Sequence, residues 1–188
     1  MPIQKVTKNE IIAKALNVFS NKGYHNTSMS DLAAEVGLLK GSFYHYFISK
    51  EELMLQILES IDYELKSSVY PLAQHKQYPA SKRMKLFLKG LSKVIVHKNG
   101  GCILGNTILE TANIYPSFRV LLTTIMDGII QSFTAIYQEL HTQEQAHILA
   151  QQTLMELEGA IMFSKLYSNP SIFQDFQKRM IQRVETDS

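Results

Sequence analysis

The sequence has one cysteine and no tryptophan among its 188 residues, and neither sign of charge is in large excess. The single thiol, Cys102, excludes a disulfide framework within the chain and any metal site built from several cysteines. The 19 basic residues nearly balance the 17 acidic ones, so the chain as a whole is neither a polycation nor a polyanion. These absences exclude a disulfide-rich secreted domain and indicate a reducing compartment such as the cytoplasm.

Long uninterrupted apolar runs are also missing. The most apolar segment, Val120 to Ile136, contains Thr123, Asp127 and Gln131, so we expect no membrane-spanning helix and no membrane partner. The first ten residues are polar and lack the apolar core of a signal peptide. The sequence therefore predicts cytoplasmic localisation.

Apolar residues instead recur at spacings of three and four along nearly the whole chain, which predicts an all-α fold of about nine helices. Capping patterns mark helix starts at Thr7, Ser28, Ser49 and Thr142, and Gly23 and Gly37 mark helix ends. Pro71 and the polar residues after it should interrupt the chain, and Asn99 to Gly101 should form a second break. No segment alternates as a strand would.

The N-terminal quarter carries the basic excess, because residues 1–50 hold six lysines against three acidic residues. A two-turn helix ending at Gly37, a tight turn and a short helix from Leu39 to Phe47 match the geometry of a helix-turn-helix. We expect a three-helix DNA-binding domain in residues 1–48 and a second, larger helical domain in residues 49–188.

The side chains around this second short helix suit contacts with phosphates and bases. Phe43 and Phe47 should face inward and leave the polar residues between them outward. A small helical bundle with a tyrosine-rich surface would fit the same periodicity. The candidate DNA-binding residues are Thr27, Ser28, Lys40, Gly41, Ser42, Tyr44, His45, Tyr46 and Lys50.

Two adjoining strings, NKGYHNTSMSDLAAEVG and GLLKGSFYHYFISKEEL, resemble the second helix and the recognition helix of the TetR (tetracycline repressor) family. The resemblance implies a homodimeric repressor of double-stranded operator DNA that a small-molecule effector releases. It implies that Thr27, Ser28 and Lys50 contact phosphates, that Lys40, Gly41 and Ser42 approach bases, and that Tyr44, His45 and Tyr46 do either. Leu39 departs from the family, which usually has a small hydroxyl residue there as a helix cap.

The resemblance also implies that the last two helices pair with their copies in a dimer. Small residues at helical spacing, including Thr153, Ala160 and Ser164, would permit that approach, although a monomer core explains them equally well. Large side chains in the middle helices would line a ligand cavity or fill the core. The candidates for the cavity are Tyr63, Phe87, Met126 and Phe163, from a set that also includes Phe118, Phe133 and Met155.

A polar line on a short apolar helix supplies further ligand candidates, because Cys102, Asn106 and Glu110 are spaced four residues apart. A thiol at the start of that helix should have a lowered pKa and raised reactivity. The segment GGCILGNTILETA resembles a subset of TetR regulators that respond to electrophiles or small unsaturated acids. The alternative is that Cys102 is a small buried hydrophobic residue.

Two other classes of protein remain as alternatives. A cysteine-dependent hydrolase would use Cys102 as nucleophile and His97 as base, but it leaves the N-terminal motif unexplained. A helical adaptor would bind no DNA. His141 and His147 are six residues apart, which does not fit a helical metal motif, so we expect no metal, no cofactor and no enzyme activity.

Overall fold

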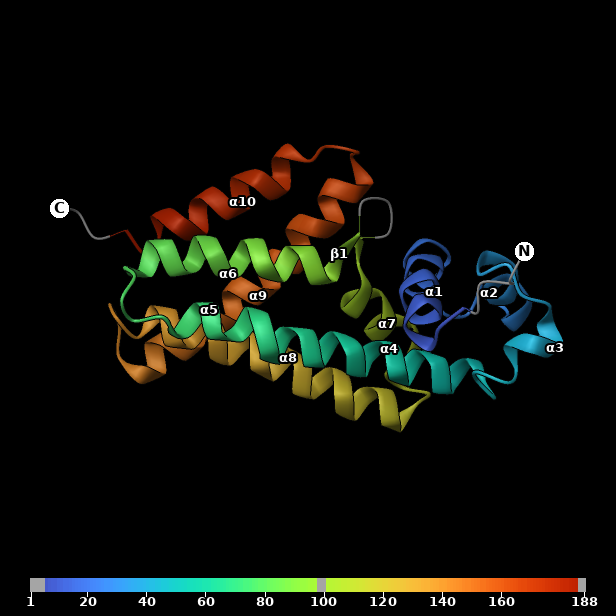
Figure 1. Ribbon diagram of the computed structural model, residues 1–188. Coiled ribbons are helices and arrows are strands. Elements are labelled where there is room, and N and C mark those ends of the chain that lie inside the picture. Colours follow the sequence, from blue (N-terminus) through green and yellow to red (C-terminus); the bar gives the residue numbers. More distant parts are fainter. Residues whose placement is uncertain (1–5, 98–100, 186–188) are drawn as a thin grey trace.

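The computed structural model describes residues 6–97 and 101–185, and it is helical almost throughout (Figure 1). Helices α1 (Lys8–Lys22), α2 (Met29–Glu35) and α3 (Lys40–Phe43) form one end of an elongated molecule. Helix α4 (Lys50–Glu64) leads from them into a body of long helices. The body comprises α6 (Ala80–Ile95), α7 (Ile103–Thr111), α8 (Pro116–Tyr137), α9 (Gln143–Leu166) and α10 (Ser171–Gln182).

A π-helical segment, η1 (Leu65–Val69), joins α4 to α5 (Tyr70–Gln74) without a break. If this continuous rod is counted once, the described ranges contain nine helices, which confirms the predicted all-α fold. The predicted interruption at Pro71 is wrong, because the helix continues to Gln74. Proline clashes with the carbonyl four residues earlier in an α-helix, and the wider turn of the π-helical segment before Pro71 relieves that clash.

Helix starts in the N-terminal end of the molecule follow the predicted caps. Thr7 forms a capping box with Glu10, Ser28 forms one with Asp31, and the Ser49 side chain accepts from the backbone N–H of Glu52. Helix α3 ends at Phe43 rather than Phe47, and its N-cap residue makes no side-chain hydrogen bond. Residues 40–47, which we call the recognition segment, are therefore one helical turn followed by tight turns.

One pair of short strands departs from the expectation of no strands. Strands β1 (Val96–His97) and β2 (Gly101–Cys102) pair antiparallel, with Val96 opposite Cys102 and His97 opposite Gly101. Their two-residue length explains why the sequence shows no alternation there. This hairpin connects α6 to α7.

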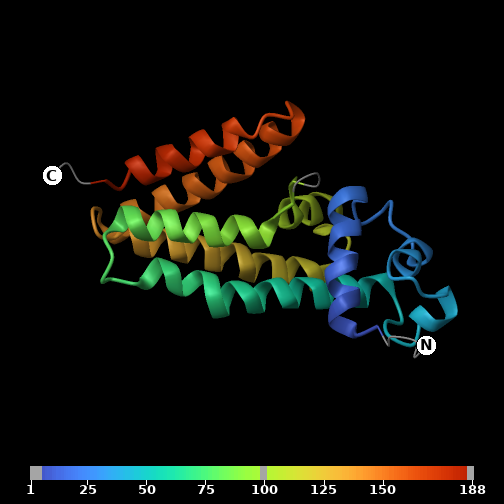
Figure 2. The same cartoon turned by 45° about the horizontal axis from the view of Figure 1, so that its top comes forward.

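One apolar core runs from the N-terminal helices into the body, where α8 and α9 pack along one another and α10 covers α6 and α9 (Figures 1 and 2). Thr153, Ala160 and Phe176 are buried within a single chain. The proposal that Thr153 and Ala160 of α9 admit a second copy is therefore wrong, and the monomer-core alternative is right for these two residues. Arg83, also buried, donates to the carbonyl oxygen of Ala73 and ties α6 to α5.

Helix α8 is, by length and composition, apolar enough to cross a membrane, which the interruptions in its sequence did not predict. Its most apolar window has a mean hydropathy of 1.4, because isolated threonines lower the average little. Nine of its side chains are buried, and they include Phe118, Ile125 and Phe133. In this fold α8 is a central core helix.

Candidate nucleic-acid interface and its connection to the helical body

Two phenylalanines hold the recognition segment against the rest of the N-terminal helices. Phe43 and Phe47 are fully buried, and their ring centroids lie 6.1 Å apart. Between them, Tyr44 and His45 point away from the core, whereas Tyr46 packs partly against it. The segment from Lys40 to His45 therefore presents an outward face fixed by an apolar anchor on its other side.

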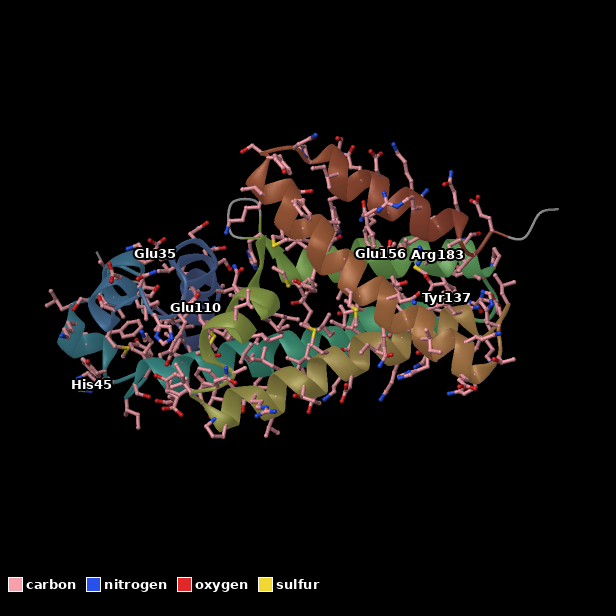
Figure 3. All side chains as sticks on the ribbon, turned by 180° about the vertical axis from the view of Figure 1, so that it is seen from behind. Glu35, His45, Glu110, Tyr137, Glu156 and Arg183 are labelled. Carbon is pink, nitrogen blue, oxygen red and sulfur yellow. The ribbon has the colours of Figure 1, made fainter. Side chains whose placement is uncertain are left out.

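The outward face is polar and open. Lys40, Gly41, Ser42 and His45 are exposed, and a Cβ added at Gly41 would meet no atom within 4 Å. Tyr44 is 42% exposed, whereas Tyr46 is half-buried. Figure 3 places His45 at the tip of the molecule, far from the body. The arrangement offers a cation, hydroxyls and an imidazole to a partner approaching that tip.

Two exposed apolar side chains flank this face. Leu39 is 81% exposed and Ile48 is 79% exposed. Leu39 makes no side-chain hydrogen bond at the start of α3, as its chemistry requires. Leu39 lies four residues before the buried Phe43, and this spacing indicates an inward position. Only the fold therefore shows that the Leu39 side chain is exposed.

Thr27 and Ser28 begin α2 with their hydroxyl groups already engaged. Thr27 is 2% exposed, and its hydroxyl donates to the carbonyl oxygen of Gly23 at 2.7 Å. The Ser28 hydroxyl belongs to a capping box with Asp31, whose pKa these hydrogen bonds and Lys22 hold well below its usual range. The Thr27 side chain thus closes the loop before α2, and only Ser28 is exposed to a partner.

Lys50 is turned inward. Its Nζ donates to the carbonyl oxygens of Tyr24 and Thr27, at 2.7 and 2.9 Å, and lies 4.3 Å from the centroid of the Tyr24 ring. Burial lowers its pKa, against the raising effect of Glu110. In this geometry Lys50 binds the loop between α1 and α2, an internal role that its position at a helix start did not predict.

The same loop is held from the other side by α7. The Glu110 carboxylate accepts from the backbone N–H of His25 at 2.9 Å, and the Glu110 carbonyl oxygen lies 2.9 Å from His25 Nε2. Gly23 has a positive φ of 81°, and a Cβ there would lie 2.5 Å from Glu110 Oε1. Figure 3 shows Glu110 at the boundary between the two parts of the molecule. Glu110 thus contacts the loop between α1 and α2 rather than a cavity in the body.

Tyr24 adds an aromatic contact across the same boundary. Its ring centroid lies 5.4 Å from that of Tyr115 and 5.5 Å from that of Phe118, both edge to face. Tyr24 is only 3% exposed. Burial raises the pKa of its hydroxyl, so the tyrosine stays neutral. The loop of residues 23–27, which we call the joint, is therefore bound to α4, α7 and α8 at once.

The residues predicted to line one ligand cavity do not lie together. Tyr63 is 74% exposed on α4 and Phe163 is 43% exposed on α9, whereas Phe87 is fully buried against Phe133. Met126 is half-buried on α8. Asn106 lies with Glu110 beside the end of α1, in a small depression. The aromatic and methionine pattern marked core and surface positions rather than a shared site.

Cys102 is buried, and its environment disfavours the thiolate. Its Sγ accepts weakly from the Gly105 N–H at 3.4 Å, but burial and the neighbouring Glu158 raise its pKa well above the ordinary value. The predicted lowering of this pKa is wrong, because desolvation outweighs the helix end. Burial also raises the pKa of Glu158, which the sequence analysis did not identify as a core carboxyl.

The hydrolase alternative fails on geometry. Along a strand, neighbouring side chains point to opposite faces, so Cys102 shares a face with Val96 and not with His97. No hydrogen bond between the thiol and the imidazole occurs in the described parts of the chain, and His97 Nε2 is buried without a partner there. Residues 6–97 and 101–185 also contain no group of three side chains that could hold a metal ion.

Comparison with known proteins agrees with this geometry. Residues 11–57, from α1 into α4, match the family described as bacterial regulatory proteins, tetR family. The transcriptional repressor DhaR of Mycobacterium sp. (strain GP1) is 22% identical over 175 residues, which cover 90% of this chain and 87% of DhaR. The regulator AcuR of Cereibacter sphaeroides is 24% identical, over 94% of this chain and 84% of AcuR.

The whole fold is matched as well. A TetR transcriptional regulator from Legionella pneumophila superposes with a TM-score of 0.86 at 19% identity, over 98% of this chain and all of that one. The residues that match the family model, 11–57, include α3 and its outward face. Residues 11–57 of the chain therefore carry the N-terminal region of the bacterial tetR regulatory family, and the whole chain has the fold of TetR transcriptional regulators.

Proposed function

We propose that this chain is a repressor that binds a pseudopalindromic operator through α3 and releases it when a small molecule binds the body. The observation that carries the proposal is the outward face of Lys40, Gly41, Ser42, Tyr44 and His45, fixed from behind by buried phenylalanines. Lys40 and the exposed hydroxyls suit phosphate and base-edge contacts in a major groove. We assign DNA binding to residues 1–48 and effector binding and dimerisation to residues 49–188.

A second copy fits the outer face of α9. Met155, Met162 and Leu166 are 71%, 58% and 67% exposed, and together with Gly159 they follow one helical face at intervals of four, three and four residues. A Cβ at Gly159 would meet nothing within 4 Å, so another helix can approach closely there. Exposed apolar faces of this kind mark interaction surfaces. Two copies would present two recognition segments to successive major grooves.

The joint supplies a path from the body to the operator. Glu110 on α7, together with Tyr115 and Phe118 at the start of α8, holds the loop that directly precedes α2. A shift of α7 moves that loop and with it the orientation of α2 and α3. In a dimer such a shift changes the distance between the two recognition segments, which must fit grooves about 34 Å apart.

The test is a mobility shift on the DNA upstream of the chain's own gene, followed by footprinting of the retarded complex. We expect a salt-sensitive complex that protects two half-sites of inverted sequence about one helical turn apart. Met155→Glu with Met162→Glu should give a monomer in sedimentation and lose the footprint. Exposed Tyr63→Glu, the matched control, should leave both unchanged. Absence of binding to any upstream fragment, or a footprint from a monomer, would contradict the proposal.

A further inference from the structure

A cleft of about 1080 Å³ lies between α6 and α10, and α9 and the β1–β2 hairpin close one end of it. Figure 1 shows α10 running alongside α6 above the rest of the body. The volume is at the upper end of the range for small-molecule sites. None of the candidates identified from the sequence as ligand-binding lines it.

The charge of the cleft is of one sign. Five lysines and no acidic residue line it. Lys85, Lys89 and Lys93 follow one face of α6 at intervals of four residues, a spacing at which like charges repel. Lys178, on α10, is partly neutralised by Asp175 at 3.3 Å. A bound anion would relieve the repulsion along α6.

The interior of the cleft is apolar and ends in two unsatisfied polar atoms. Leu88, Ile161 and Ile181 contribute aliphatic surface to its walls. At the hairpin end, His97 Nε2 and the Ser164 hydroxyl are buried and have no hydrogen-bond partner within residues 6–97 and 101–185. Buried polar atoms are nearly always paired, so two unsatisfied atoms in one lining indicate a missing partner.

From the one-signed charge, the aliphatic walls and the two unsatisfied polar atoms we infer that this cleft binds an amphipathic organic anion. The acidic head lies at the lysines of α6, and the chain fills the aliphatic interior. A polar group on that chain, when present, bonds to His97 and Ser164. Burial lowers the pKa of His97, so it offers a neutral imidazole to that group.

The position of the cleft gives such a ligand access to the joint. His97 and Gly101 line the cleft and belong to the hairpin that continues directly into α7, the helix that carries Glu110. An anion that moves the hairpin therefore moves the contact between Glu110 and His25. This effector role depends on the proposed repressor function, whereas binding to the cleft does not.

The site is tested by titration calorimetry on the full chain without DNA, with decanoate as the anionic probe and 1-decanol as the neutral one. Decanoate should bind, more weakly as NaCl is raised, and decanol should bind at least about tenfold more weakly. Lys89→Gln with Lys93→Gln should weaken decanoate binding about tenfold or more. Lys66→Gln with Lys82→Gln, the same charge change outside the lining, should leave it unchanged.

Two results would overturn the inference. One is equal binding of decanoate and decanol, which would make the cleft a neutral apolar groove. The other is undiminished decanoate binding by the Lys89 and Lys93 double variant when circular dichroism shows it folded. If the double variant does not fold, the chemical shift of the His97 ring on adding decanoate decides, because His97 lines the cleft: no shift contradicts the site. Because no DNA is present, a failure of operator binding cannot produce any of these results.

Discussion

The DNA-binding end and the helical body of this chain form their candidate sites in different ways. The face of α3 consists of neighbours in sequence, fixed by Phe43 and Phe47 a few residues away. The cleft of the body draws on α6, α9 and α10, which are separated by tens of residues in the sequence. The difference shows why a local motif identified the first site, whereas the second required the fold.

The joint between the two regions should show the largest effect. Tyr24→Ala removes a ring that contacts Phe19, Tyr115 and Phe118 in a buried cluster, so we expect a loss of roughly 3–5 kcal/mol of unfolding free energy. Urea denaturation followed by circular dichroism measures it. Tyr63→Ala, a change at a 74% exposed ring, should cost less than about 0.5 kcal/mol. Equal losses in the two variants would show that Tyr24 does not join the regions.

Glu110→Ala should loosen the contact between the two regions, with a smaller loss of unfolding free energy than Tyr24→Ala. It removes the acceptor of the His25 N–H, so we expect faster hydrogen exchange at residues 23–28 and about fivefold to tenfold weaker operator binding. Glu59→Ala, on the exposed side of α4, is the matched control. If exchange in the joint stays as slow as in the unmodified chain, Glu110 does not hold it and the proposed path from body to DNA fails.

Much of the DNA-binding end could be predicted from the sequence because its signals are local. Capping at Thr7, Ser28 and Ser49 fixed the helix starts, and the spacing of Phe43 and Phe47 fixed the outward face. The inward turn of Lys50 could not be predicted, because its acceptors are carbonyl oxygens 23 and 26 residues earlier. From the sequence alone, a lysine at a helix start is expected to be exposed. Only the fold shows the loop that Lys50 binds.

The body was predicted less well because burial depends on packing between distant helices. Helical spacing gives the same pattern for a core residue such as Phe87 and a surface residue such as Phe163. The position of Cys102 at a helix start predicts a thiol with a lowered pKa. Instead, burial and the Glu158 carboxyl of α9 raise that pKa. The sequence does contain one local signal of the cleft, the repeat of lysines at four-residue intervals along α6.

The smallest predicted effect concerns that buried carboxyl and depends on pH. Burial raises the pKa of Glu158 in the folded chain, so its stabilising contribution is complete below its unfolded value near 4.5 and is lost as the pH rises through the folded value. Glu158→Gln should therefore match the unmodified chain at about pH 4 and be more stable by roughly 1 kcal/mol at neutral pH. Thermal unfolding at both pH values measures this difference. A variant that is less stable at neutral pH would mean that the ionised carboxylate is satisfied in the core.

The central claim is that the outward face of α3 contacts operator DNA directly, and Lys40 tests it most directly. Operator affinity of the unmodified chain, Lys40→Ala and the control Lys66→Ala is measured by fluorescence anisotropy across several NaCl concentrations and on operators with single base changes. We predict that Lys40→Ala binds about tenfold more weakly, has a shallower salt dependence and discriminates less at one base position in each half-site, while Lys66→Ala binds normally. Unchanged affinity, salt dependence and base preference in Lys40→Ala would contradict the account.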